Sequence, residues 1–323
     1  MGTYGGTRGS AAIRGSAAIR LIRASLSTTA ILLSAIAVPF GGALLLLIAP
    51  QPGLRLGAAA GHAERLLLVT IVAMAAALGA GAPAAVFYVA SFGLVTLLLP
   101  IVLEREWSLE VTAGVVTAIV AAAVLGIVFA TVSPGALASS FRDALDEVRV
   151  QAVEMYGRTG LRPDVVRELQ EGSARLIDLI LKLTPALFLL TVSAMVLLNV
   201  ELLRRSQRAR GLVPVFGDLT RWKCPPDLVW VLIASGYMTF LSSGLSEWIA
   251  MNVLAVLFGV YFCQGLAIAQ FYMRRWRSPL WVVALVYVFI VVEWLVATGV
   301  TLVGVFDLWA DFRRLNPRPV EED

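Results

Sequence analysis

Polar side chains inside the long apolar runs of this chain are few, and Glu293 is the clearest case. It lies near the middle of an apolar run over residues 280–306. A carboxylate at bilayer depth costs about 2.5–3.5 kcal/mol on insertion scales, so it is by default a candidate functional group. The alternative is a structural hydrogen bond to Gln264 or Tyr261. If the run breaks between residues 293 and 298, Glu293 would instead cap a half-helix.

Three further polar residues share one apolar run, over residues 252–277, which ends on three arginines and a tryptophan. Asn252 opens this run, and Tyr261 and Gln264 lie inside it. Together with Glu293 they are candidate ligand-binding residues. Arg55 joins them because it could bind an anionic ligand, although an arginine at the end of a span also serves as a lipid-headgroup anchor.

A second group of candidates lies in the arginine-rich segment between two apolar runs. A basic segment with an interfacial tryptophan is an ordinary cytoplasmic anchor, and it could also dock an acidic partner. The candidate docking residues are Arg204, Arg205, Arg208, Arg221, Trp222 and Lys223.

The composition indicates a membrane protein. Of the 323 residues, 59% are hydrophobic and 15% are charged, whereas about a quarter are charged in a soluble domain. The mean hydropathy is +0.83. The net charge is only +4, and the arginines cluster at the ends of apolar runs, which fits the positive-inside rule better than a nucleic-acid surface. We therefore expect a multi-pass protein of the bacterial inner membrane, with the lipid bilayer as its partner and no bound nucleic acid.

The sequence shows no pattern typical of an enzyme. It has two cysteines and one histidine, without the spacing of a metal site or a disulfide framework. It contains no nucleotide-binding loop and no hydrolase nucleophile elbow. We therefore expect no metal, no cofactor and no catalysis.

The expected fold is an all-α bundle of transmembrane helices. Because the hydrocarbon core offers no water, each apolar run must satisfy its backbone polar groups internally and so forms a helix. The count is eight spans, or nine if residues 22–50 form two short spans split at Pro39. The expected parts are a flexible basic tail (1–20), a first transmembrane bundle (21–132), an amphipathic surface hairpin (133–176), a second transmembrane bundle (177–314) and a polar tail (315–323).

Several stretches in a fixed order resemble the YybS-like family of predicted bacterial inner-membrane proteins of unknown function. They are Pro185-Ala186 after the amphipathic insert, Arg221-Trp222-Lys223 with Pro225, Asn252, the stretch Tyr261-Phe262-x-Gln264-Gly265-Leu266-Ala267, and Asp307-x-Trp309-x-Asp311-Phe312-Arg313. The resemblance covers residues 26–314. It implies a multi-pass membrane protein and names no activity.

The first part of the chain is also similar in pattern to the substrate-capture subunits of energy-coupling-factor vitamin transporters. The similarity rests on the proline break, on Pro52-Gly53-Leu54-Arg55-Leu56-Gly57, and on the small pair Ala30-x-x-x-Ser34. Such subunits bind a small molecule inside a helical bundle and dock on a coupling subunit. The polar hairpin and the spans after residue 176 depart from that pattern, so no vitamin ligand is carried over.

Two functions remain open. The first is a non-catalytic subunit that binds or transports a small solute, which predicts a polar-lined cavity around the intramembrane polar residues. The alternative is a membrane assembly or scaffold protein for envelope processes, which predicts a packed interior and a protein partner.

Overall fold

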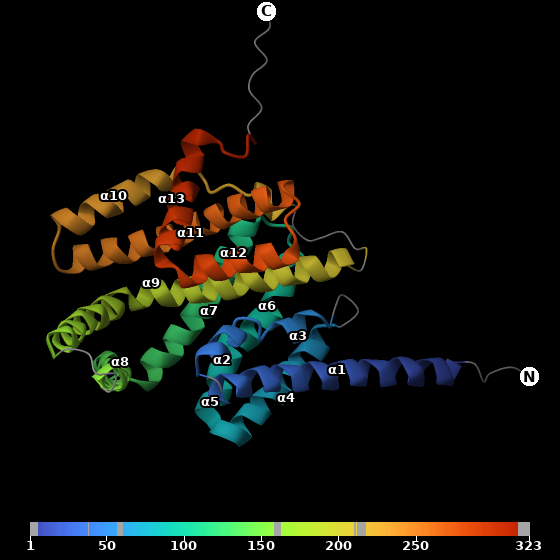
Figure 1. The fold of residues 1–323 in the computed structure, drawn as a ribbon. Coiled ribbons are helices and arrows are strands. Elements are labelled where there is room, and N and C mark those ends of the chain that lie inside the picture. The colour runs from blue at the N-terminus through green and yellow to red at the C-terminus, as the bar shows by residue number, and fades with distance from the viewer. Residues whose placement is uncertain are drawn as a thin grey trace, which may run out of the picture. The chain divides into compact units, whose positions relative to one another are not determined.

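The computed structural model describes residues 6–37, 39–56, 61–157, 163–209, 211 and 218–315. Every regular element in these residues is a helix (Figure 1), which confirms the all-α prediction. Long apolar runs fold this way because a helix pairs its backbone groups within the segment.

The chain divides into two compact units, one of Met1–Ser133 with Thr191–Phe216 and one of Pro134–Leu190 with Gly217–Asp323. The long helix α9 contributes its second half to the first unit and its first half to the second. The first unit also contains α1 (Gly6–Ala37), α2 (Pro39–Leu46), α3 (Gln51–Leu54), α4 (His62–Ala80), α5 (Ala82–Tyr88), the π-helix η1 (Val89–Gly93), α6 (Leu94–Leu103) and α7 (Leu109–Thr131). The second unit contains α8 (Pro134–Gly157), α9 (Pro163–Ala209), the 3-10 helix η2 (Leu219–Arg221), α10 (Leu228–Leu241), α11 (Leu245–Arg275), α12 (Leu280–Val292) and α13 (Trp294–Ala310).

Among the described residues, six helices are long and apolar enough to cross a membrane, or seven spans if the bent pair α12–α13 counts as one. The expected count of eight or nine is therefore not confirmed. Two shorter apolar helices, Leu44–Leu54 and Leu228–Leu241, account for the difference. The break at Pro39 is present, but α2 after it has only eight residues, too few for the 30 Å core.

The amphipathic segment forms two helices, α8 and the start of α9, and Pro163 begins the second. Residues 158–162 between them lie outside the described residues. Helix α9, with 47 residues in all and Pro185 inside it, runs on into the next apolar run. An Arg142–Asp178 ion pair of 2.6 Å joins α8 to α9. The position of this hairpin at the membrane surface stays a prediction.

Helix α1 begins at Gly6, so residues 6–20, expected as a flexible tail, are helical. The tandem GSAAIR repeat explains this difference, because alanine and arginine are strong helix formers. Residues 1–5 and 316–323 lie outside the described residues.

Helix α11 is the centre of the second unit, and α10, α13 and η2 all pack against it (Figure 1). Helices α11 and α13 approach so closely at two glycines that neither position has room for a side chain. A Cβ atom on Gly304 would overlap the carbonyl oxygen of Tyr261, and one on Gly265 would overlap the backbone of Val300. This is the close packing that small residues permit between membrane helices.

The last apolar run is broken at Glu293. Helices α12 and α13 meet at 101°, and Glu293 between them has φ −96° and ψ 106°, outside the helical region. The expected break is therefore confirmed and Glu293 occupies the N-cap position of α13, but its carboxylate makes no capping hydrogen bond. A single straight span over residues 280–306 is wrong.

Candidate functional site

The most buried charges of the second unit form an ion pair at the end of α13. An Arg313 Nη donates to Asp307 Oδ2 at 2.8 Å, and both side chains are 0% exposed. The turn after α13 brings the pair together, because Asp311 adopts a left-handed conformation (φ 39°) and directs the chain back toward the helix. The backbone N–H of Phe312 then donates to Asp307 Oδ1 at 3.0 Å.

The Arg313 side chain of this ion pair also binds the backbone of the loop that precedes α10. Arg313 donates to the carbonyl oxygens of Thr220 (2.7 Å) and Trp222 (2.8 Å). Gln264 of α11 completes the arrangement: its Nε2 donates to Asp307 Oδ2 at 3.1 Å, and its Oε1 accepts from the backbone N–H of Cys224 at 3.0 Å. We call these side chains of Gln264, Asp307 and Arg313, with the bound loop backbone of residues 220–224, the polar latch.

More exposed ion pairs surround the polar latch. Lys223 Nζ lies 2.6 Å from Asp311 Oδ1, and an Arg274 Nη lies 2.9 Å from Asp218 Oδ1. The hydroxyl of Tyr272 donates to the carbonyl oxygen of Phe312 at 2.7 Å. The end of α11, the end of α13 and the loop before α10 therefore lie together.

The side chain of Asn252 in α11 bonds backbone groups of α9 next to a proline. Pro185 has no N–H and its ring displaces the preceding turn, so a helix loses backbone hydrogen bonds around it. The Asn252 side chain occupies this gap: its Oδ1 accepts from the N–H of Ala186 at 3.0 Å, and its Nδ2 donates to the carbonyl oxygen of Lys182 at 3.0 Å. Those two backbone groups, four residues apart, would pair with each other in an uninterrupted helix. Pro185 itself removes the bond to the carbonyl oxygen of Leu181, and Asn252 bonds both groups of the next pair along the helix.

Glu293 is not joined to the residues that the sequence suggested. Gln264 pairs with Asp307 instead, and Glu293 lies exposed at the break between α12 and α13. Tyr261 is buried where α11 crosses α13. The structure therefore brings Gln264 and Tyr261 into one packed region and leaves Glu293 outside it.

Arg55 belongs to a hydrogen-bonded chain in the first unit. Its Nε donates to Gln51 Oε1 at 3.2 Å, and Gln51 Nε2 donates to the carbonyl oxygen of Asn199 at 2.7 Å. Asn199 in turn donates to the carbonyl oxygen of Leu47 at 2.7 Å. These bonds tie the turn between α2 and α3 to α9.

The six expected docking residues divide into two groups. Three of them are engaged within the chain. Arg204 is 1% exposed and pairs with Glu201 at 2.8 Å. Lys223 pairs with Asp311, and the carbonyl oxygen of Trp222 accepts a hydrogen bond from Arg313 of the polar latch. The exposed ones are Arg205, which also contacts Glu201 (2.7 Å), Arg208 and Arg221.

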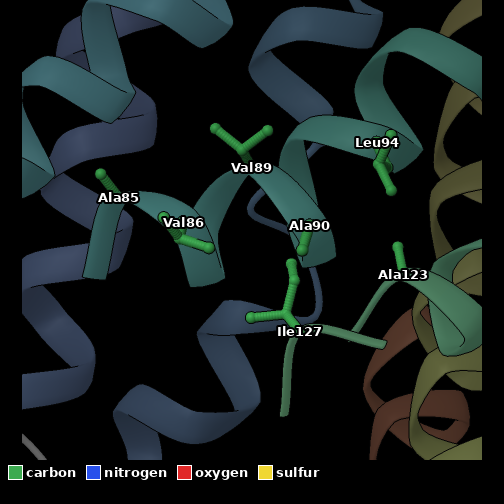
Figure 2. Close-up of a pocket in the computed structure, with 7 residues that line it drawn as sticks. All are labelled: Ala85, Val86, Val89, Ala90, Leu94, Ala123 and Ile127. Carbon is green, nitrogen blue, oxygen red and sulfur yellow. The ribbon is translucent and has the colours of Figure 1, made fainter. Parts of the chain in front are cut away.

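Two open pockets in the described residues are apolar. One, of about 390 Å³, is lined by Ala85, Val86, Val89, Ala90, Leu94, Ala123 and Ile127; Figure 2 shows only aliphatic side chains around it, from α5, η1, α6 and α7. The other, of about 380 Å³, lies at the crossing of α11 and α13, lined by Gly265, Ile268, Ala269, Val296, Gly299, Val300 and Val303. Neither pocket offers a polar side chain to a solute.

A family model described as "Predicted membrane protein (DUF2232)" matches residues 26–308. The chain belongs to the DUF2232 family. Comparison with curated proteins and with solved structures gives no match. The DUF2232 match confirms a membrane protein and covers most of the stretch that carried the YybS-like resemblance. The YybS-like name and the likeness to vitamin-transporter subunits are not confirmed.

Sequence reasoning did not assign a role to Asp307, Arg313, Gln51 or Asn199. A signal existed for Asp307, because it is a carboxylate near the end of an apolar run with an arginine six residues later. Asn199 carried the same signal as Asn252, an amide inside an apolar run, but its partners Gln51 and Leu47 lie about 150 residues away in sequence.

Proposed function

We propose that this DUF2232 protein is a non-catalytic component of a membrane assembly in the bacterial cytoplasmic membrane, where it binds a partner protein. The two functions considered from sequence predict different interiors. A solute-binding subunit needs free polar groups around a cavity, because a few convergent polar groups orient a bound small molecule. An assembly protein needs a packed interior and exposed docking groups.

One observation carries the proposal: the two amides that the sequence marks as candidate ligand-binding residues, Asn252 and Gln264, are bonded within the chain. Asn252 fills the gap at Pro185, and both ends of the Gln264 amide are engaged in the polar latch. A solute would have to break these bonds and leave buried groups unpaired, at a cost of about 1–3 kcal/mol each. The apolar lining of the two open pockets supports the same conclusion.

The exposed arginines are the proposed docking groups for an acidic segment of the partner. Arg208 and Arg221 are exposed, and Arg205 is exposed while it shares Glu201 with Arg204. Arginine forms bidentate pairs with carboxylates, which gives such contacts orientation as well as strength. In the first unit Arg204 would support Arg205 and Arg208 from within, and in the second unit Trp222 and Lys223 would support Arg221.

Affinity purification of the full chain from native membranes tests this proposal. We expect a partner membrane protein at defined stoichiometry, with recovery reduced at least tenfold by the pair Arg205→Glu and Arg208→Glu and weakened by salt, since exposed charges are screened. Arg142→Glu is the matched control, because this arginine is also half-exposed and paired with a carboxylate. Recovery that is equal in all three proteins would contradict the proposal.

A small-solute subunit is the second candidate, favoured by the break at Glu293. Transporters commonly place substrate or ion sites between half-helices that interrupt a span. This candidate predicts a stoichiometric small molecule in the purified protein that is lost in Glu293→Ala and retained in Glu247→Gln.

A further inference from the structure

Helix α12 starts near the C-terminal end of α11, and helix α13 ends near the same place. Helix α12 begins at Leu280, five residues after α11 ends at Arg275. The far end of α13 is bonded to the same region, through Tyr272 to Phe312 and through Arg313 to the loop before α10. The bend of 101° between the two helices permits this return. The pair is therefore re-entrant, with Glu293 at its tip.

The length of α12 is sufficient to carry the tip well into the hydrocarbon core. The 13 residues of α12 span about 20 Å, at 1.5 Å per residue, against a hydrocarbon core of about 30 Å. The side chains around the carboxylate are large, apolar and exposed: Val292 is 71% exposed and Trp294 is 72% exposed. Membrane proteins do not expose irregular backbone or a carboxylate to the hydrocarbon core, so another protein segment must cover Glu293 and the break beside it.

We propose that the tip around Glu293 docks a transmembrane helix of a second protein, and that this helix carries a lysine or arginine at the depth of the carboxylate. An opposite charge neutralises Glu293, and the exposed valines and tryptophan pack against the rest of the helix. The inference rests on the proposed function, because it names the chemistry of the partner and the surface that it contacts inside the membrane.

A second copy of this chain does not supply the required charge. In the residues that the structure describes, the basic side chains of the candidate spans lie in their outer parts: Arg65, Arg274 and Arg275 are in terminal turns, and Arg20 and Arg23 are in the first third of Ala17–Ala35. Lys182 borders its apolar stretch and lies 3.9 Å from Glu247. A different protein is therefore the partner that charge complementarity selects.

Photo-crosslinking in native membranes tests this inference on the full chain. A photoreactive amino acid at Val292 should form a crosslink to a transmembrane peptide of another protein, within one helical turn of a lysine or arginine. The matched position is Leu285, two turns earlier on α12 and 63% exposed, where the same partner should react more weakly. Glu293→Lys should reduce the Val292 crosslink about tenfold, and exchange of the partner's basic residue for glutamate should restore it.

Four results would overturn the inference: a crosslinked peptide without a basic residue, a crosslink to a second copy, a crosslink to phospholipid alone, or a yield unchanged by Glu293→Lys. If the partner still co-purifies through the exposed arginines in any of these cases, the inference fails and the proposed function stands. If affinity purification recovers no partner at all, the proposed function fails with it.

Discussion

Replacement of Asn252 by alanine should destabilise the protein through α9 rather than through α11, where Asn252 resides. The substitution leaves the N–H of Ala186 and the carbonyl group of Lys182 without the amide that now bonds both at 3.0 Å. Each buried unpaired backbone group costs about 1–3 kcal/mol. Measured side-chain couplings between membrane helices are smaller, about 0.6 kcal/mol on average and about 1.7 at most. We therefore expect Asn252→Ala to lower the free energy of unfolding by about 2–3 kcal/mol.

The interrupted helix supplies the control that isolates this cause. In Pro185→Ala the chain regains an N–H at position 185 and loses the ring that displaces the preceding turn, so Ala186 can bond Lys182 directly. In the Pro185→Ala background, Asn252→Ala should then lower the free energy of unfolding by less than about 1 kcal/mol. A double-mutant cycle should therefore give a coupling free energy between Asn252 and Pro185 of about 1 kcal/mol or more. The free energies would come from reversible unfolding in mixed micelles, with Gln270→Ala as a matched amide on α11. An equal cost of Asn252→Ala in both backgrounds would refute the role assigned to Asn252.

Two further substitutions test the packing of α13. Arg313→Leu should destabilise the protein by about 3–5 kcal/mol, because it removes the buried positive charge that pairs with Asp307. The control Arg314→Leu, at the exposed neighbouring residue, should change stability by less than about 0.5 kcal/mol. Similar effects of the two substitutions in an unfolding titration would contradict the buried ion pair. Gly304→Ala should cost about 1–3 kcal/mol through overlap with the backbone of α11. A Cβ atom on Gly299 of the same helix would lie in open space, so Gly299→Ala should leave stability unchanged or raise it. A melting temperature of Gly304→Ala above that of Gly299→Ala would contradict the close crossing of α11 and α13.

The fold was largely predictable from sequence, because a run of about 20 apolar residues has only one way to satisfy its backbone in a bilayer. The number of spans was less predictable. The short helices α2 and α10 have apolar composition but not the length of a span. The break at Glu293 was predictable only as an alternative, since a carboxylate in an apolar run is equally compatible with a buried hydrogen bond.

The pairing of polar residues was not predictable, because it depends on tertiary contacts. Asn252 was expected as a buried amide, but its target at Pro185 lies on another helix and 66 residues separate Asn252 from Ala186. Gln264 was expected, as an alternative to Tyr261, to bond Glu293 if that carboxylate were structural. The structure pairs it with Asp307, which the left-handed turn at Asp311 brings together with Arg313.

Native mass spectrometry of the gently extracted full chain is the most direct test of whether the protein binds a partner protein or a solute. We expect a complex whose excess mass is a protein subunit, with no stoichiometric small molecule, because Asn252 and Gln264 are already bonded within the chain. A small ligand bound one to one, lost in Glu293→Ala or Gln264→Ala and present without any partner subunit, would contradict the proposed function and establish a solute site.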